Sequence, residues 1–422
     1  MRLVKKELCT GCNACYSICP VHCISMQEDQ EGFLYPAIEK EKCALCKKCE
    51  TACPAIVQGN KRKPLHVFAA KNPNEEIRRQ SSSGGIFTLI AESVIQKGGV
   101  VFGARFDDNW GVVHDYTETA EGLAAFRGSK YVQSRIGDTY LSAKDFLLAG
   151  RKVLFCGTPC QIAGLKAFLQ EDYDNLLTVD LVCHGVPSPL VWKRYLDEVI
   201  AVPPPRKIGD KLITSINFRE KTSGWKVFTL LILFKINISM NKEDITNINF
   251  RDKKKGKSDF TLETASADTG STVFLRENLN QNTFFKGFLK NLFLRPSCYK
   301  CPVRSFKSQS DITIGDYWGI QNFIPEFDDD KGVSLVTINT EKGREIYKTL
   351  NKDDRETGYF QAIAGNPNIE NSVPLPAKRS IFFTKLNNES VISLINGLTA
   401  LSLWWRIRKK ISILLSRLVC KK

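Results

Sequence analysis

The sequence lacks the two features that would place a protein in or across a membrane. No run of 18 apolar residues is present, so a conventional membrane-spanning helix is excluded. The first residues, MRLVKKELC, contain no apolar core or cleavage site of the kind that directs secretion, and we expect a cytoplasmic protein. Disulfides persist mainly in oxidising compartments, so the 15 cysteines are expected to be thiolate ligands instead.

Acidic residues are absent from the end of the chain, and this explains much of its basic character. The formal net charge is +15, of which a short C-terminal stretch supplies seven, leaving +8 for the rest. A basic tail on an otherwise ordinary chain does not indicate nucleic-acid binding. The seven residues are Arg406, Arg408, Lys409, Lys410, Arg417, Lys421 and Lys422.

Apolar residues in the same tail recur at helical intervals. We therefore predict an amphipathic helical tail over residues 377–422. Its longest uncharged run, from Ser390 to Trp405, is too short and too polar to span a bilayer. Two alternatives remain open: a peripheral helix at the inner face of the membrane, or a helix that docks on the protein body or a partner subunit. The apolar positions include Val391, Leu394, Ile395, Leu398, Leu401 and Trp405.

With 422 residues the chain is expected to form two or three domains. Residues 1–58 are rich in cysteine, and the polar segment 59–65 follows as a linker. Residues 66–196 alternate strand-like and helical runs, which predicts an α/β domain with a mixed, largely parallel sheet. Residues 197–376 continue that domain through an irregular α+β section, and the tail 377–422 completes the chain.

A cysteine motif of the form C-x2-C-x2-C-x3-C-P occurs twice before residue 58, and no other internal repeat is present. In this motif three thiolates hold one 4Fe-4S cluster and the fourth ligates the other cluster. The sequence therefore predicts a small ferredoxin-like domain with two clusters. One would be held by Cys9, Cys12, Cys15 and Cys53, and the other by Cys43, Cys46, Cys49 and Cys19.

These cysteines allow two other interpretations. Zinc prefers two cysteine pairs and has no use for a third evenly spaced thiolate, so the spacing favours iron–sulfur clusters. Cys23 falls outside the pattern. We expect it to be a small buried thiol and not a ligand.

A run of small residues enters an apolar helix in the sequence SSSGGIFTLIAESV. Such a junction allows phosphate oxygens to approach backbone N–H groups at the positive end of a helix. The alternative is that Ser83 merely caps the helix. The segment RGSKYVQS adds Arg127, Lys130 and Tyr131 as candidate anion and ring contacts, or as an ordinary solvated loop.

Further cysteines lie where predicted strands end. Cys156 and Cys160 follow one strand, Cys183 and His184 follow the next, and a Cys298-x2-Cys301 pair comes later. Ligands in α/β folds gather at strand ends, so some of these thiols could join the pair around a third cluster. The alternatives are a redox-active dithiol at Cys156 and Cys160, or buried structural cysteines. We find no proton donor, since His184 is more typical of a structural histidine.

The motifs occur in an order that resembles a known family, the beta subunits of coenzyme F-420 hydrogenases and dehydrogenases fused to a two-cluster ferredoxin. The resemblance extends over most of residues 1–340, although residues 200–280 depart from the pattern. It is carried by the cysteine repeat and by SSSGGIF, RGSKYVQS, FCGTPCQIAGLK, DLVCHGVPSP, FLRPSCYKCP and SDITIGDYWGI.

The resemblance implies an oxidoreductase in which FAD exchanges electrons between iron–sulfur clusters and a hydride carrier. Flavin is suited to this because clusters carry single electrons and hydride acceptors take two. The acceptor would be a deazaflavin coenzyme or another conjugated molecule, since relatives reduce a chlorophyll derivative. By the same resemblance Ser82, Ser83, Gly84 and Gly85 would contact the FAD pyrophosphate, with Lys130 near the flavin.

Two other classes of function compete with this enzyme. The chain could be an electron-delivery subunit for a separately encoded partner, for example in polysaccharide biosynthesis, or a structural iron–sulfur scaffold whose clusters cannot be reduced. Bound FAD and turnover of an acceptor would distinguish the enzyme from both.

Overall fold

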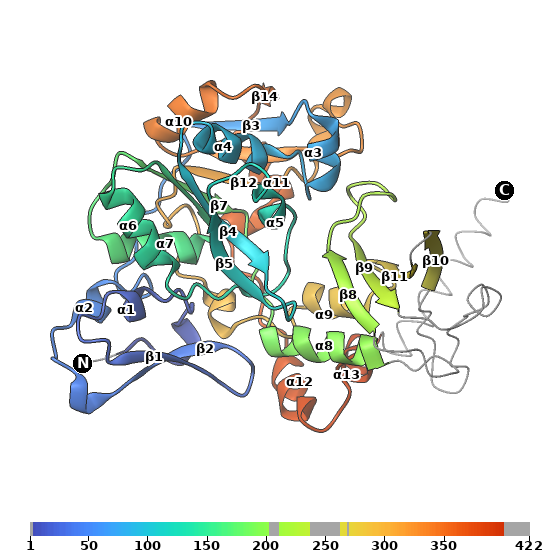
Figure 1. Ribbon diagram of the computed structural model, residues 1–422, viewed down its shortest axis with the longest axis horizontal. Coiled ribbons are helices and arrows are strands. Elements are labelled where there is room, and N and C mark those ends of the chain that lie inside the picture. Colours follow the sequence, from blue (N-terminus) through green and yellow to red (C-terminus); the bar gives the residue numbers. More distant parts are fainter. Residues whose placement is uncertain (1–2, 202–210, 237–261, 268–269, 401–422) are drawn as a thin grey trace, which may run out of the picture.

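The computed structural model describes residues 3–201, 211–236, 262–267 and 270–400. A large mixed sheet with helices on both faces forms the centre of the molecule (Figure 1). The cysteine-rich N-terminal module lies against one side of this body, and a smaller antiparallel sheet lies on another. The architecture is therefore α/β with an added ferredoxin-like module.

The large sheet has eight strands in the order β14-β3-β13-β12-β7-β6-β4-β5. Its central neighbours β12, β7, β6 and β4 are parallel, whereas β5, β13, β3 and β14 join antiparallel. The prediction of a largely parallel sheet is thus wrong outside the centre. The physical reason lies in the connections from β4 to β5 and from β12 to β13, because neither contains the crossover α-helix that parallel pairing needs. The strands are β3 (His66–Lys71), β4 (Val100–Phe106), β5 (Val112–Thr117), β6 (Val153–Gly157), β7 (Leu176–Leu181), β12 (Ile312–Asp316), β13 (Ser334–Ile338) and β14 (Asp353–Glu356).

Alternate residues of the central strands pack on opposite faces of the sheet. Val101 and Leu154 lie in the core with helices α4 and α5, whereas Phe102 and Phe155 lie in the core with α6 and α7. This alternation follows from the period of two along a strand. The helices are α3 (Glu75–Gln80), α4 (Ile86–Ile95), α5 (Leu123–Phe126), α6 (Thr139–Leu148), α7 (Pro159–Leu169), α10 (Glu341–Lys348) and α11 (Tyr359–Gly365).

The two copies of the cysteine motif fold in the same way. Each copy begins with a short 3-10 helix. One residue in the left-handed conformation directly precedes the second cysteine, and another lies two residues before the third. These residues are Gly11 and Asn13 in the first copy, and Leu45 and Lys47 in the second. The module also contains a hairpin, paired antiparallel from Ile24↔Ile38 to Glu28↔Leu34. Its elements are η1 (Lys6–Leu8), α1 (Ala14–Ser17), β1 (Ile24–Glu28), β2 (Leu34–Ile38), η2 (Lys40–Lys42) and α2 (Lys48–Thr51).

A close contact joins this module to the body. A Cβ built on Gly164 of α7 would lie 3.0 Å from Cys12 Sγ, so only glycine leaves room for the cysteine at this point. Ala14 and Ala52 of the module are fully buried in the same core as α6 and α7. The first cysteine motif is therefore held directly against α7.

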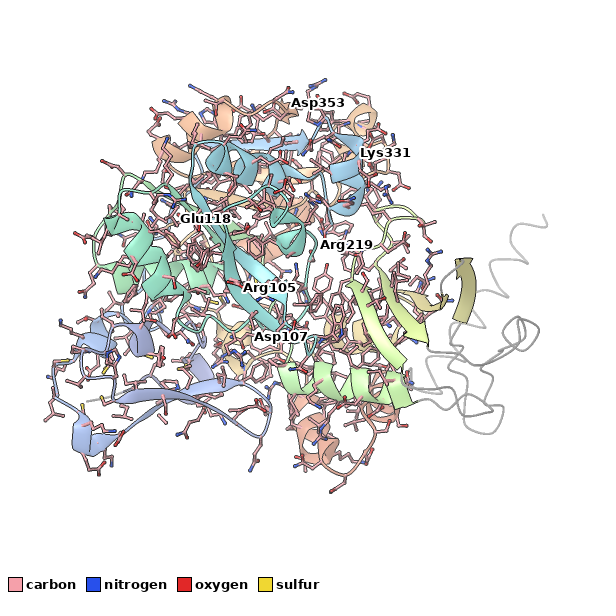
Figure 2. All side chains as sticks on the ribbon, in the orientation of Figure 1. Arg105, Asp107, Glu118, Arg219, Lys331 and Asp353 are labelled. Carbon is pink, nitrogen blue, oxygen red and sulfur yellow. The ribbon has the colours of Figure 1, made fainter. Side chains whose placement is uncertain are left out.

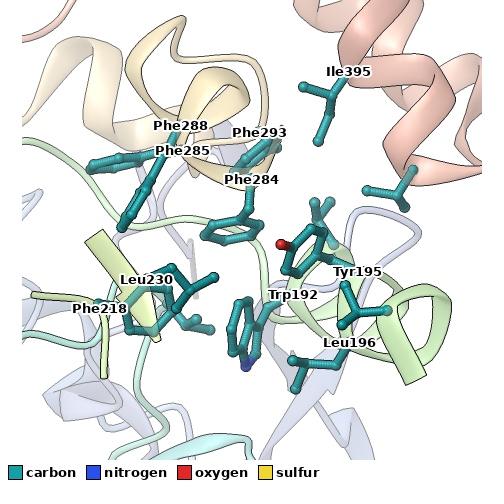
Figure 3. Close-up of a cluster of buried hydrophobic side chains, with 14 of the residues drawn as sticks. Trp192, Tyr195, Leu196, Phe218, Leu230, Phe284, Phe285, Phe288, Phe293 and Ile395 are labelled. Atoms are coloured by element: carbon teal, nitrogen blue, oxygen red, sulfur yellow. The ribbon is translucent and has the colours of Figure 1, made fainter. Parts of the chain in front are cut away.

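The section after residue 196 is more regular than the predicted irregular α+β fold. It forms an antiparallel sheet in the order β10-β11-β9-β8, covered by an aromatic core in which Trp192 and Phe284 meet (Figure 3). The Lys-rich loop RDKKKGKSD lies outside the described residues. The elements are α8 (Pro189–Ala201), β8 (Lys211–Asn217), β9 (Thr229–Ile236), β10 (Leu262–Ala267), β11 (Gly270–Asn278) and α9 (Thr283–Leu289).

The beginning of the predicted tail packs on the body. Val391, Leu394 and Ile395 of α13 are buried in the core formed with α8 and α9. Glu198 of α8 accepts the N–H of Ile392 at 3.0 Å and so caps α13. The first half of the expected lipid-facing stripe is thus already covered. The helices are α12 (Arg379–Leu386) and α13 (Val391–Thr399).

The remainder of the predicted tail, residues 401–422, lies outside the described residues and includes the seven basic residues of the C-terminal stretch. Among the described helices, none has the length and apolar character needed to cross a bilayer. The remaining short helices are η4 (Pro296–Lys300), η5 (Ile320–Asn322), η6 (Pro325–Phe327) and η7 (Pro367–Ile369).

Candidate iron–sulfur and cofactor sites

The first group of ferredoxin thiols surrounds one small cavity. Cys9, Cys12, Cys15 and Cys53 all line it, together with part of Cys49. Cys53 comes from the second motif, and it reaches this group because α1 and α2 pack side by side. These are the four residues that the crossed ligation pattern assigns to one cluster.

The second group lies at the other end of the module. Burial raises the pKa of Cys49, and the neighbouring charges of Glu50, Cys46 and Cys19 raise it further. Cys23 lies against the same group, with its Sγ 3.5 Å from that of Cys19. Cys23 is 3% exposed, which agrees with the predicted small buried thiol, and Cys43 is a further neighbour. Cys46 is exposed to solvent.

The donor chemistry of these groups fits iron–sulfur clusters. Burial and the neighbouring thiols of Cys53 and Cys9 raise the pKa of Cys12 to about 12, so a free thiolate is unfavourable there. A cationic iron centre reverses this preference, because a coordinating thiol is deprotonated. Among the described residues, no three His, Cys, Asp or Glu side chains are placed to hold a single metal ion, and the thiols of the first group line a small cavity.

A third group of thiols assembles from three distant segments. Cys160 begins α7, Cys183 follows β7, and Cys298 and Cys301 belong to η4 and its end. Burial and the thiols of Cys301, Cys183 and Cys298 raise the pKa of Cys160 well above its usual range. Burial and the thiols of Cys298 and Cys301 raise the pKa of Cys183 to about 12, against the opposing charge of Arg304. Four thiols therefore converge outside the ferredoxin module.

Cys156 does not belong to this group. It is buried in the core with Leu154 on the face of the sheet that α4 covers. Its charged neighbours are Asp180 and Lys130, and burial raises its pKa to about 12. The neighbours of Cys160 are instead the thiols of Cys301, Cys183 and Cys298.

One large cavity lies beside the third thiol group, with a volume of about 440 Å³. It opens where β6, β7 and β12 end, at the carboxyl edge of the parallel strands, where α/β folds place ligands. The volume is in the range of small-molecule and cofactor sites. Its lining includes Ser82, Ser83, Gly85, Lys130, Tyr131, Cys183 and His184.

The SSSGG segment forms one wall of this cavity. Ser82 Oγ accepts the N–H of Ser129 at 2.7 Å and so joins the two loops that the sequence singled out. Gly85 is the N-cap of α4 with φ 82°, and no side chain caps the helix. Gly85 and Ile86 both line the cavity, so the positive end of the helix lies at its wall. Ser83 Oγ donates to Val333 O at 2.7 Å, which anchors the segment on β13.

Gly84 has a different position from the one expected. Its N–H donates to Ser334 Oγ at 3.0 Å, and a Cβ at this position would lie 2.4 Å from Ala70 O. Gly84 therefore lets the loop approach β3 and β13 and supports the cavity wall from behind.

Lys130 is half-buried at the cavity wall. Its ammonium group donates to Arg127 O and Gly128 O, each at 3.2 Å. Burial lowers the pKa of Lys130 to about 7, against the opposing effect of Cys156. The side chain can therefore gain or lose a proton near neutral pH.

His184 is held by two amide side chains. Its Nε2 lies 2.7 Å from Asn291 Oδ1, and its Nδ1 lies 3.2 Å from Asn368 Nδ2. With both ring nitrogens engaged, the geometry favours the structural interpretation of this histidine.

A buried ion pair beside the cavity was not predicted from the sequence. Arg219 follows β8 and pairs with Asp316 at the end of β12 at 2.6 Å, so it lies between the two sheets (Figure 2). It also donates to the hydroxyl of Tyr131 at 3.2 Å and lies 4.1 Å from the ring centre of Phe228. The only signal was Asp316 within SDITIGDYWGI, because Arg219 falls in the section that departs from the family pattern.

The fold and these thiol groups define an iron–sulfur electron-transfer protein with a cofactor-sized cavity. Family models for the coenzyme F-420 hydrogenase/dehydrogenase beta subunit match in two parts, the N-terminal model over residues 67–138 and the C-terminal model over residues 150–358. A model for a 4Fe-4S dicluster domain matches residues 8–57. The chain belongs to this beta-subunit family and carries an N-terminal dicluster ferredoxin domain, which confirms the resemblance.

Among solved structures, the chain is similar to a subunit in a xenon-derivatized F-420-reducing nickel–iron hydrogenase complex from Methanosarcina barkeri. The identity is 17%, the match covers 72% of this chain and 85% of that chain, and the TM-score is 0.41. No curated protein matches the chain.

Proposed function

We propose that this protein is a flavin-dependent iron–sulfur oxidoreductase that carries electrons between three 4Fe-4S clusters and FAD, and from there to or from a two-electron acceptor. The observation that carries the proposal is the double position of Cys183, which belongs to the third thiol group and also lines the 440 Å³ cavity. A cluster held there would lie at the wall of the cofactor site.

The third cluster would be held by Cys160, Cys183, Cys298 and Cys301. Their donor set has the same chemistry as the ferredoxin sets, with four half-buried thiols and no carboxylate among them. Arg304 donates to the carbonyl groups of Cys183 and His184, which fixes the loop after β7. Val186 N–H points to Cys298 Sγ at 3.4 Å, as backbone donors do around cluster ligands.

FAD would occupy the cavity with its pyrophosphate at the N-terminus of α4. Ser82, Ser83 and Gly85 form this wall, and the positive helix end favours phosphate oxygens. When bound, a flavin couples one-electron and two-electron chemistry. Lys130 is placed to hold a proton near the cavity, and Tyr131 contributes part of an aromatic wall.

The acceptor would be coenzyme F-420 or another flat conjugated molecule, because the cavity wall is aromatic where β12 ends. Phe228 and Trp318 line it with ring centres 5.6 Å apart, and Tyr131 lies beside them. Flat rings stack well on such surfaces. The cavity favours this enzyme over a subunit that only delivers electrons to a partner, since delivery alone needs no site of this size.

The first test is the iron and flavin content of the chain purified without oxygen. We expect about twelve irons per chain, four for each of three clusters, and about one FAD. Metal analysis and flavin extraction would measure both. About eight irons would remove the third cluster from the proposal, and about four or fewer would contradict the dicluster module itself.

Turnover separates the enzyme from the delivery subunit. The purified chain with bound FAD should reduce an artificial two-electron acceptor when electrons are supplied to its clusters. A chain that takes up electrons and holds FAD but passes none to any soluble acceptor would favour the delivery function.

A further inference from the structure

Arg295 is a buried arginine between the ferredoxin module and the body of the protein. It is 1% exposed and immediately precedes η4, which carries Cys298. Its Nε donates to Cys9 O at 2.7 Å and one terminal nitrogen donates to Leu34 O at 2.8 Å. The other terminal nitrogen donates to Gln133 Oε1 at 3.0 Å. The guanidinium therefore joins the module to the RGSKYVQS loop, residues 127–134.

The charge of Arg295 has no carboxylate partner in the part of the chain that the structure describes. The nearby acids of the β1–β2 turn are taken: Asp29 pairs with Lys6 at 2.7 Å, and Glu31 pairs with Arg379 at 2.5 Å. An arginine does not lose its proton inside a protein, and a buried charge is costly unless it is balanced. A negative group within reach of the guanidinium would therefore be stabilised.

The group in reach is the sulfur of Cys9. A terminal nitrogen of Arg295 points to Cys9 Sγ at 3.7 Å, and Cys9 belongs to the first ferredoxin thiol group. Gly11 leaves space for this approach, because a Cβ there would lie 2.7 Å from the guanidinium. The rings of Tyr35 and Phe33, with centres 4.3 and 5.3 Å away, shield the contact from water.

The same residue is tied to the third thiol group. Its carbonyl oxygen accepts the N–H of Cys298 at 2.9 Å. One residue thus contacts a ligand of the first ferredoxin cluster through its side chain and a ligand of the third cluster through its backbone. Arg295 therefore bridges the two sites through hydrogen bonds of its side chain and its backbone.

We propose that Arg295 is a positioning residue that sets the spacing of these two clusters and raises the reduction potential of the first one. The inference rests on the proposed function, because it takes both clusters to be present. Reduction adds negative charge to a cluster, and a fixed cation in a dry environment stabilises the reduced form more than the oxidised form. An electron would therefore be favoured on the cluster that faces the body.

The test is Arg295→Gln, which keeps hydrogen-bonding capacity and removes the charge. EPR-monitored redox titration should show that the midpoint of one ferredoxin cluster falls, with about a tenfold change in its oxidised-to-reduced ratio, or about 59 mV for one electron. The other ferredoxin cluster, held at the exposed Cys46 end, should keep its midpoint. Arg295→Lys restores the charge, so we expect it to recover most of the shift.

The double variant Arg379→Gln with Glu31→Gln, which removes both charges of this ion pair, is the matched control. Arg379 anchors the same module through Glu31 and donates to Leu294 O at 3.0 Å, but its charge is paired with that carboxylate. Loosening the module without changing the charge near Cys9 should leave all midpoints in place. Equal shifts in both variants, or unchanged midpoints in Arg295→Gln with full iron content, would overturn the proposal.

Gln133→Glu keeps the test available if Arg295→Gln fails to assemble its clusters. It places a carboxylate where the amide oxygen already accepts from Arg295, so the charge is balanced while the guanidinium remains. We expect the same downward shift, and an unchanged midpoint would contradict the proposal. A wild-type iron content of about eight would remove the third cluster from the proposed function, while the shift of the first ferredoxin cluster would still be measured.

Discussion

Replacing Cys298 by alanine should remove about four of about twelve irons per chain and leave the ferredoxin module filled. Cys298 supplies one of four thiols that converge from α7, the loop after β7 and η4. A cubane that loses one of its four protein ligands at a partly accessible site is not expected to persist. Iron analysis and the EPR spectrum of the reduced protein would show the loss, and electron delivery from the ferredoxin to the flavin should stop.

The control for this experiment is Cys156→Ala. Cys156 lies four residues before Cys160, but it is buried in the core with Leu154, and its charged neighbours are Asp180 and Lys130. Its removal should leave the iron content unchanged. If both variants lose the same amount of iron, the loss reports general instability and the assignment of the third cluster fails.

Ser82→Asp should release FAD while the clusters remain. The side chain lies at the cavity wall beside the positive end of α4, where the proposal places the pyrophosphate. Repulsion between like charges about 5 Å apart at an effective dielectric constant of about 20 is on the order of 3 kcal/mol, or roughly a hundredfold loss of affinity. Flavin absorbance and titration of the flavin-free protein with FAD would measure this loss.

Ser82→Asn is the matched variant, since it adds a similar volume without charge and can still accept the N–H of Ser129. It should retain most of its flavin. Equal binding by the aspartate and asparagine variants would place the pyrophosphate elsewhere in the cavity. Gly84 is a poor choice for this test, because any side chain there would collide with Ala70 O and disturb the sheet.

The sequence by itself determined the features whose spacing is local. The two cysteine repeats fixed the ligand pattern of the ferredoxin module, because each motif needs only a few residues of backbone to wrap a cluster. The predicted strands at VVFGARF, KVLFCG and LTVDLV are present as β4, β6 and β7, since continuous apolar runs are typical of buried parallel strands. The helix after SSSGG is likewise present as α4.

Only the tertiary structure decided which of the later cysteines meet. Cys156 and Cys160 are four residues apart, yet the first shares a face of β6 with Leu154 and the second begins α7. The direction of a strand residue depends on where the strand begins and which face is covered, and this is set by distant helices. The role of Arg295 was equally hidden, because its partners Cys9, Leu34 and Gln133 are brought together only by docking of the module on the body.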